Sequence, residues 1–273
     1  MLQIHPYNLG SKSAMALKGW LVDNGVKCIV SHRRIGNPKR GRLIVGWGAK
    51  DWDFVPFPKD RFINEPAQTK ILSCKRKFFD AVTDKEAIPV YTADPAVAVR
   101  WGSDIVCRAT TTGHSGVGIT ICAAGVVGVN ELPRVPLYVK YQKKTQEYRV
   151  HCFKYPPKPG EAIKHTWHFA HYQKKIFIKT PERPEPLDWK VRNHAQGFTF
   201  QTVDDIPLKV KDVCCSVLDD LDVDFCALDV IHHKPTDVAL VLEGNTAPGL
   251  EDGRLAVYGQ YLKTRYEEFR LAV

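Results

Sequence analysis

The stretch from Val223 to Glu251, VDFCALDVIHHKPTDVALVLEGNTAPGLE, contains two apolar runs. These runs, Phe225–Ile231 and Val238–Leu242, have the length and composition of short β-strands. The segment between them, His232–Asp237, includes a proline and is typical of a turn. The stretch therefore predicts a hairpin of two antiparallel strands.

Three oxygen-bearing side chains lie toward the end of this hairpin. Because side chains alternate between the two faces of a strand, Ala239, Val241 and Glu243 are expected to share one face. Asn245 continues this face just past the strand end. Asp229 on the first strand is expected to lie opposite Glu243, because the two positions have the same parity.

Such a convergence of oxygens favours a metal site. Two neighbouring carboxylates repel each other in the absence of a cation. Mg²⁺ prefers hard oxygen ligands, and proteins commonly hold it with one or two carboxylates and the phosphates of a substrate. A solvated strand end with unrelated acidic residues is the alternative.

The segments ALDV and VLEGNTAPGL resemble the metal-binding hairpin of the ATP-grasp superfamily. The resemblance implies that Asp229, Glu243 and Asn245 hold Mg²⁺, or Mn²⁺ in its place, under the triphosphate of ATP. The NTAPG ending resembles the D-alanine–D-alanine ligases in particular. In those enzymes the loop after the Asn helps to position the acceptor substrate.

Bulk composition is that of a globular enzyme. The chain has 273 residues, and its hydrophobic content of 44% and charged content of 25% are ordinary. No apolar run approaches the roughly 18 residues that a membrane span needs, and the N-terminus lacks a signal-peptide pattern. The eight cysteines include no CxxC pair, so free thiols in a reducing compartment, the cytoplasm, are expected.

The net charge of +9 favours anionic partners such as nucleotide phosphates, acidic peptides or nucleic acid. Two basic runs, His32–Arg42 and Lys140–Lys144, are not interleaved with aromatic residues in the manner of a base-stacking surface, since the second contains a single Tyr141, and both are expected to be solvated. Nucleic-acid binding through Arg33–Arg42 stays an alternative. It predicts that retention on DNA or RNA falls steeply as the salt concentration rises.

The N-terminal segment predicts a small open parallel sheet. A helix capped by Ser11 or Ser13 is expected to end near Asp23, followed by strands at Val26–Val30 and Leu43–Trp47. Because the segment lacks a GxGxxG motif, it is expected to shape a substrate cleft rather than to bind a dinucleotide.

One or two helices are expected over residues 67–83, followed by a short strand at AIPVY. In the ATP-grasp family a Lys near the start of this helix reaches the nucleotide phosphates. Lys75 is the best match, with Lys70 and Lys77 as neighbouring candidates, and a helix-surface role is the alternative.

The segment IVCRATTTGHSGVGIT, residues 105–120, predicts a strand, a glycine-rich loop and a second strand. It is not a Walker loop, because it lacks GK[ST] and no helix follows. It resembles the loop that closes over ATP phosphates in ATP-grasp enzymes, although an ordinary hairpin turn is the alternative. Arg108 stands where many members have Lys, and Arg also binds phosphate. The implied phosphate-binding residues are Lys75, Arg108, Thr112, Gly113, Ser115, Gly116 and Gly118.

Two further segments resemble parts of the nucleotide cleft. Leu137, Tyr138 and Val139 resemble the interdomain linker whose backbone pairs with adenine. The run EYRVH resembles the Asp/Glu-x-Arg strand of the family, whose basic residue faces the nucleotide cleft, and this implies that Arg149 faces the cleft. Arg149 alternates with Val150, so it points away from the side that Val150 buries, and a surface role is the alternative.

Arg192, followed by Asn193, resembles an element near the reacting phosphoryl group of peptide-forming ATP-grasp ligases. An Arg there would neutralise an acyl-phosphate as it forms. An amphipathic helix is expected at Pro207–Leu221 and another over residues 251–273. Three histidines in HTWHFAH have no nearby carboxylate to orient them, so a zinc site is not favoured.

The predicted fold class is α/β (α+β), an ATP-grasp fold with a small N-terminal open sheet. The expected domains are a substrate-side lobe (1–66), a small lobe with the glycine-rich loop (67–135) and a C-terminal lobe with the metal site (136–273). The resemblance implies an ATP- and Mg²⁺-dependent carboxylate–amine or carboxylate–thiol ligase that forms an acyl-phosphate. Its substrates would be a small-molecule or peptide carboxylate and an amine. A nucleotide-binding module without turnover is the other alternative.

Overall fold

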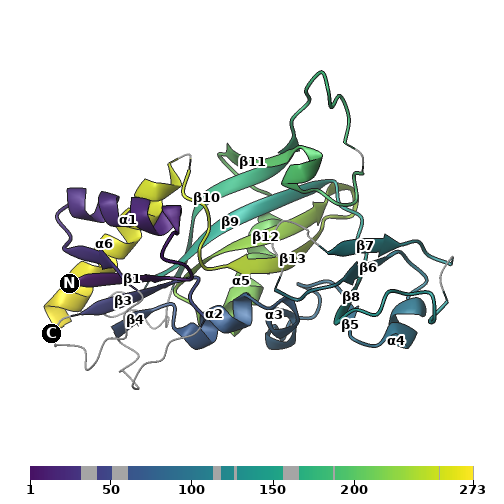
Figure 1. Cartoon of the computed structure of the whole chain (residues 1–273), viewed down its shortest axis with the longest axis horizontal. Coiled ribbons are helices and arrows are strands. Elements are labelled where there is room, and N and C mark those ends of the chain that lie inside the picture. Colours follow the sequence, from purple (N-terminus) through teal and green to yellow (C-terminus); the bar gives the residue numbers. More distant parts are fainter. Residues whose placement is uncertain are drawn as a thin grey trace.

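The computed structural model describes residues 1–31, 42–50, 61–112, 118–125, 128–155, 166–186, 188–251 and 253–272. Three β-sheets follow one another along the chain, with helices packed against them (Figure 1). This mixture of helices and sheets confirms the predicted fold class. Within the described ranges, no helix is long and apolar enough to cross a membrane.

The first sheet is parallel, with strand order β2-β1-β3-β4. Its helix begins after Ser11, whose hydroxyl accepts a hydrogen bond from the backbone N–H of Ala14, and ends at Asp23 as predicted. The central strand β1 was not predicted, although it is buried along its whole length. The elements are β1 (Leu2–Pro6), α1 (Lys12–Asp23), β2 (Cys28–Val30), β3 (Leu43–Trp47) and β4 (Phe62–Ile63).

The second sheet has the order β5-β8-β6-β7 and is antiparallel. Two short helices precede it, as expected for residues 67–83. The elements are α2 (Pro66–Leu72), α3 (Lys75–Ala81), β5 (Tyr91–Thr92), α4 (Pro95–Val99), β6 (Ile105–Arg108), β7 (Ile119–Cys122) and β8 (Leu137–Lys140).

The third sheet is antiparallel and has the order β11-β10-β9-β12-β13. The predicted hairpin forms β12 and β13 of this sheet. The predicted amphipathic helix is α5, which packs against the sheet. The elements are β9 (Gln146–Tyr155), β10 (Thr166–Phe177), β11 (Phe198–Val203), α5 (Leu208–Asp220), β12 (Phe225–His233), β13 (Val238–Asn245) and, after the hairpin, α6 (Arg254–Ala272).

The two faces of the third sheet have different neighbours. Leu228 and Val230 of β12 pack in one core with α5. Phe225, on the other face, packs with α6, α1 and the first sheet. Because α6 and the first sheet cover only one end of this face, its other end, with Asp229, lines a pocket.

The division into domains after residues 66 and 135 stays a prediction. Two elements of the predicted C-terminal lobe, β8 and α6, lie beside elements of the other two lobes. β8 begins at Leu137 but lies inside the second sheet. α6 ends the chain but packs beside α1 on the first sheet (Figure 1).

All eight cysteines are free thiols, and five of them are buried.

Candidate active site

The pairing of β12 with β13 changes register at one point. Val230 pairs with Val241, but the residue before it on β12, Asp229, pairs with Glu243. Leu242 is therefore an extra residue on β13, as in a β-bulge. The bulge places Asp229 and Glu243 directly opposite each other, as predicted.

The same bulge corrects the expectation that Ala239, Val241 and Glu243 share a face. Ala239 and Val241 are buried in the core with α5. Leu242 and Glu243 instead both line the pocket on the opposite side of the sheet. A bulge adds one residue to a strand, so the alternation of side chains shifts by one position beyond it.

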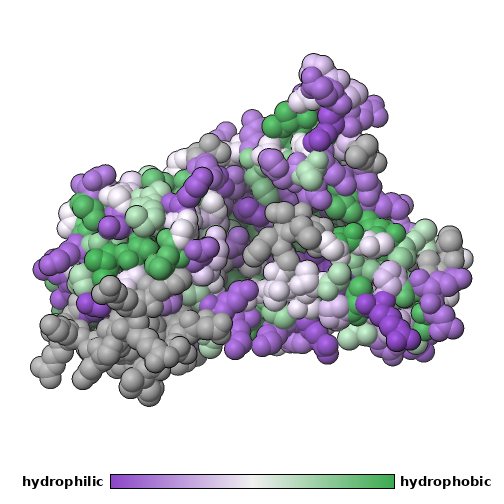
Figure 2. Space-filling model, in the orientation of Figure 1, coloured by the Kyte–Doolittle hydropathy of each residue, from purple (hydrophilic) through white to green (hydrophobic). Residues whose placement is uncertain are grey.

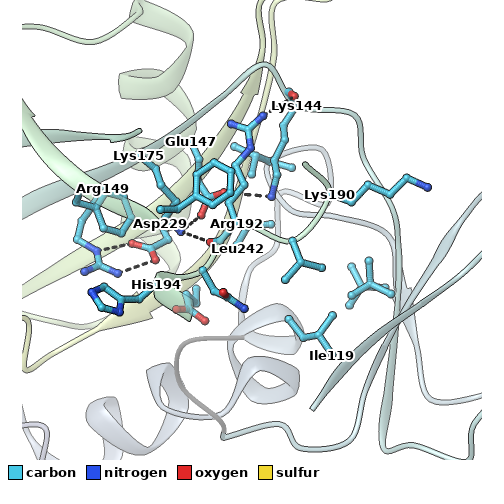
Figure 3. Close-up of a pocket in the computed structure, with 18 of the residues that line it drawn as sticks. Ile119, Lys144, Glu147, Arg149, Lys175, Lys190, Arg192, His194, Asp229 and Leu242 are labelled. Atoms are coloured by element: carbon cyan, nitrogen blue, oxygen red, sulfur yellow. Dashed lines mark hydrogen bonds and ion pairs between the residues drawn. The ribbon is translucent and has the colours of Figure 1, made fainter. Parts of the chain in front are cut away.

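The pocket has a volume of about 530 Å³ and lies between the third sheet and the second sheet (Figure 3). Hydrophilic side chains surround a hollow at the centre of the molecule in Figure 2. Basic side chains outnumber acidic ones in the lining, which favours a polyanionic ligand. The basic residues are Lys75, Arg108, Lys140, Lys144, Arg149, Lys175, Lys190, Arg192 and Arg254, and the acidic ones are Glu147, Asp229, Glu243 and Glu251.

Asp229 is held by Arg149, its direct cross-strand neighbour on β9 (Figure 3). The Nε and Nη2 atoms of Arg149 donate to the two carboxylate oxygens at 2.6 and 2.8 Å. The guanidinium also lies over the ring of Phe200, 4.2 Å from its centroid. Burial alone would raise the pKa of Asp229, but Arg149 outweighs it and holds this pKa below its usual range.

Glu243 is held by Lys75, the first residue of α3. The Nζ atom of Lys75 lies 2.6 Å from the carboxylate of Glu243, whose side chain is 33% exposed. The backbone N–H of Lys75 donates to the carbonyl of Thr111 at 2.8 Å, which ties α3 to the segment after β6. Lys70 and Lys77 are exposed. Of the three candidate lysines, the structure therefore brings Lys75 to the pocket.

Asn245 lies on the same face as Glu243, two pairs further along, opposite Ala227. Its Oδ1 atom accepts a hydrogen bond from the backbone N–H of Ala247 at 2.8 Å. Each carboxylate oxygen of Asp229 and Glu243 keeps a second lone pair, so these three residues fit a hard cation such as Mg²⁺. In the described part of the chain, no cluster of three or more His, Cys, Asp or Glu side chains forms an alternative metal site. The ligand assignment stays a prediction.

Arg108 ends β6 and lines the pocket. Its Nε atom is buried and has no hydrogen-bond partner among the described residues. Burial lowers the pKa of Arg108, and the charge of Glu243 opposes this shift. Gly118 accepts a hydrogen bond from Ala109 at 2.9 Å, and its φ of +72° suits glycine.

Thr112 is exposed, and its backbone N–H donates to the hydroxyl of Thr110 at 3.2 Å. The predicted loop residues Gly113, Ser115 and Gly116 lie outside the described residues, as does most of the basic run at His32–Arg42.

The expectation that Leu137, Tyr138 and Val139 form a linker is wrong. They belong to β8, whose backbone pairs with β6 on one side and β5 on the other. Leu137 and Tyr138 are fully buried in cores, and only Val139 reaches the pocket. The connection between the second and third sheets is residues 141–145, which contribute Tyr141, Gln142 and Lys144 to the lining.

Arg192 lines the pocket from the segment between β10 and β11. Its guanidinium donates to the backbone carbonyls of Lys144, Thr145 and Trp189, each at 3.3 Å. Burial lowers the pKa of Arg192, and the charge of Glu147 opposes the shift. Arg192 therefore ties its own segment to the connection between the sheets.

A buried cluster around Glu147 was not predicted. Glu147 forms ion pairs with Lys144, at 3.1 Å, and with Lys175 of β10 (Figure 3). The Nζ atom of Lys175 also donates to the carbonyl of Arg192 at 3.1 Å. Lys144 is 10% exposed, so the expectation that Lys140–Lys144 is solvated is wrong for this residue. Alternation along β9 places Glu147 beside Arg149 and is the one signal that could have indicated it.

The fold matches solved structures of ATP-grasp ligases over nearly the whole chain. PsnB, solved with a phosphomimetic variant of its minimal precursor, Mg and ADP, is 11% identical with a TM-score of 0.65, and the match covers 97% of this chain and 98% of PsnB. D-cycloserine synthetase DcsG is 14% identical with a TM-score of 0.59, covering 97% and 99% of the two chains. D-alanine–D-alanine ligase from Bacillus anthracis is 12% identical with a TM-score of 0.58, covering 98% and 99%.

The sequence itself matches no protein-family profile and no curated protein. At identities this low, likeness establishes the fold. The chain therefore has the fold of the ATP-grasp superfamily and resembles its carboxylate–amine ligases.

Proposed function

We propose that the protein is an ATP- and Mg²⁺-dependent ligase that joins a carboxylate to an amine or a thiol. The observation that carries this proposal is the pairing of Asp229 with Glu243 on the sheet face that lines a basic pocket. The structural neighbours support it, because they are ATP-grasp ligases and PsnB was solved with Mg and ADP.

In the proposed reaction, a carboxylate oxygen of the first substrate attacks the γ-phosphorus of ATP, and ADP leaves. The amine or thiol then attacks the carbonyl carbon of the acyl-phosphate, and inorganic phosphate leaves. Little covalent chemistry is asked of the protein, since positioning and charge neutralisation carry most of such a reaction.

Each pocket residue has a proposed role in this reaction. Asp229, Glu243 and Asn245 would hold Mg²⁺, or Mn²⁺, which when bound neutralises and orients the phosphates. Lys75 and Arg108 would bind phosphate oxygens, with the loop residues Thr112, Gly113, Ser115, Gly116 and Gly118.

Two arginines would neutralise the group in transfer. Arg149 would act through the N–H groups that Asp229 leaves unused, because only its Nε and Nη2 atoms donate to that carboxylate. Arg192 would approach the acyl-phosphate from the segment between β10 and β11, which also lines the pocket.

The proposed substrates are a peptide or small-molecule carboxylate and an amine. PsnB was solved with a precursor peptide, and other neighbours include D-cycloserine synthetase and D-alanine–D-alanine ligase. The free thiols support the cytoplasm as the place of action.

A screen for phosphate release tests the proposal. ATP, MgCl₂ and pools of amino acids, peptides and polyamines are incubated with the protein, and Glu243→Gln protein is the matched blank. We expect at least one pool to release phosphate and form a new product by mass spectrometry. Tight ATP binding with no phosphate release in any pool would contradict the ligase. Such a result would favour a nucleotide-binding module without turnover, which the presence of Arg108 in place of the family's usual Lys also favours.

A further inference from the structure

Gln173 of β10 lies in the same cross-strand row as the predicted metal ligands. It pairs directly with Arg149, which pairs with Asp229, so the backbones of Gln173 and Asp229 lie two strand spacings, about 10 Å, apart. Gln173 is 0% exposed to solvent but lines the pocket. A neutral amide at this position extends the row beyond the charged residues.

The orientation of the Gln173 amide is fixed by its partners. Its Oε1 atom accepts from Nη1 of Arg254 at 2.8 Å and contacts Nε2 of His151 at 3.2 Å. An Arg side chain can only donate, so the oxygen of the amide must face Arg254. Nε2 of His151 is then a donor as well, and Nδ1 of this ring accepts from the hydroxyl of Tyr258 at 2.9 Å.

This arrangement leaves the NH₂ group of Gln173 on the other side of the amide. The Nε2 atom is buried and has no acceptor among the described residues. A buried donor without a partner is unfavourable, because it gives up its hydrogen bonds to water and receives none in return. Such a donor on the wall of a pocket is therefore best explained by an acceptor on a ligand.

Arg254, the first residue of α6, closes this end of the pocket. Its Nε atom donates to the carbonyl of Glu251 at 2.6 Å, and its Nη2 atom lies 3.0 Å from the carboxylate of Glu251. Gly249 and Glu251 also line the pocket here. The end is thus built from β10 and the segment after β13, away from the strands β6 and β7.

We propose that Gln173 donates a hydrogen bond from Nε2 to a carbonyl oxygen of the second, non-nucleotide substrate. This inference rests on the proposed function and adds a recognition element to it. An ammonium group cannot accept from an amide N–H, and the acceptors that the proposed substrates carry are a carboxylate and a peptide carbonyl, so the recognised group is one of these two. The oxygen would lie beyond the Arg149–Asp229 pair, on the side away from the predicted metal.

The variant Gln173→Glu tests this hydrogen bond. It keeps an oxygen for Arg254 and His151, replaces the unpaired NH₂ group with a second acceptor and adds a negative charge, which the control also adds. Gln201→Glu, the same change on the exposed part of β11, is the matched control. For the substrate pair that wild-type protein uses, we expect Gln173→Glu to raise the KM of the carbonyl-bearing substrate by at least about 10-fold, since a site that hydrogen-bonds a substrate discriminates strongly. The KM of ATP should not change, and Gln201→Glu should match wild type in both.

Binding of small probes tests the same contact without turnover. Acetate represents a carboxylate and N-methylacetamide a peptide carbonyl, and each is titrated into protein with ADP and MgCl₂. The readout is the ¹⁵N–¹H signal of the Gln173 side chain, identified by its loss in Gln173→Glu. A saturable shift with either probe supports the proposal, and the stronger probe identifies the source of the carbonyl.

Two outcomes separate this inference from the proposed function. If ADP binds and neither probe moves the Gln173 signal, the recognition element is wrong and the ligase proposal stands. If a probe shifts the signal but no nucleotide binds, the ligase proposal falls and the carbonyl site stands. An unchanged KM in Gln173→Glu would also overturn the inference.

Discussion

Asp229 and Glu243 lie directly opposite each other, yet the protein holds them in different ways. Both oxygens of Asp229 accept from Arg149, and its side chain is 10% exposed. Glu243 has one contact with Lys75, and its side chain is 33% exposed. The two carboxylates should therefore respond differently to substitution, although both are proposed to bind the same ion.

Replacing Glu243 with Gln should abolish Mg²⁺-dependent phosphate release while the fold survives. The change removes one charge from a partly exposed side chain, so the free energy of unfolding should fall by no more than about 1 kcal/mol. Melting temperature and phosphate release are measured on one preparation. A fully active Glu243→Gln protein would remove Glu243 from the metal site.

Replacing Asp229 with Ala should instead destabilise the protein strongly. It leaves the Arg149 guanidinium, whose side chain is only 20% exposed, without its carboxylate partner, and breaking a buried pair costs about 3–5 kcal/mol. The double variant Asp229→Leu/Arg149→Met, which leaves no unpaired charge, should recover much of this loss. Urea unfolding of the three proteins checks both statements, and an Asp229→Ala protein as stable as wild type would show that the pair is not buried in solution.

Lys75 and Lys77 offer a matched comparison on one helix. Lys75 contacts Glu243 inside the pocket, whereas Lys77 is exposed. Loss of a charged hydrogen bond to phosphate should cost about 1.5–3 kcal/mol, so Lys75→Ala should weaken ATP affinity by on the order of 10- to 100-fold. Lys77→Ala should bind as wild type does. Equal affinities in calorimetric titration would make Lys75 a structural partner of Glu243 alone.

The sequence could predict the hairpin but not its detailed register. The apolar runs and the turn at His232–Asp237 are local signals, and they placed β12 and β13 correctly. Nothing in VALVLEGN marks Leu242 as the extra residue, because a bulge depends on how the partner strand and the pocket are packed. The predicted pairing of Asp229 with Glu243 was confirmed, but the face assigned to Val241 and Glu243 was wrong.

Long-range contacts account for the other gaps. Glu147 and Lys175 are 28 positions apart and meet only because β9 and β10 pair. β1 mixes buried polar residues, Gln3 and His5, with Leu2 and Ile4, which conceals the apolar run of a central parallel strand. The apolar run Leu137–Val139 was taken for a linker, although its backbone groups are satisfied inside a sheet.

Buried His151 should make stability depend on pH. Burial lowers the pKa of His151 to about 3, against about 6.5 in an unfolded chain. Between these values the unfolded state binds a proton that the folded state does not, so the free energy of unfolding falls as the pH falls. The loss should be about 1.4 kcal/mol per pH unit below about pH 6.5. The variant His151→Gln should lose this component, and an unchanged slope in urea unfolding at several pH values would show that His151 is protonated in the fold.

Arg192 distinguishes a ligase from a passive nucleotide binder. A group that meets negative charge only as the acyl-phosphate forms acts on the transition state and not on bound ATP. Arg192→Ala should therefore leave ATP affinity close to wild type and lower turnover by on the order of 10²–10³, as for the loss of a preorganised donor. Three of the five N–H groups of this guanidinium already donate to backbone carbonyls. The other two remain available for the proposed contact.

The contacts of Arg192 also define the opposite outcome. If the side chain only ties its segment to Lys144 and Thr145, the melting temperature of Arg192→Ala should fall while turnover per folded molecule holds. Nucleotide affinity, melting temperature and phosphate release measured on one preparation separate the two roles. Arg192→Lys is the control, because it keeps the charge but cannot span three carbonyls. Restored turnover with a lowered melting temperature in Arg192→Lys would show two separate roles. The positive charge would act in the reaction, and the hydrogen bonds of the planar guanidinium would stabilise the fold.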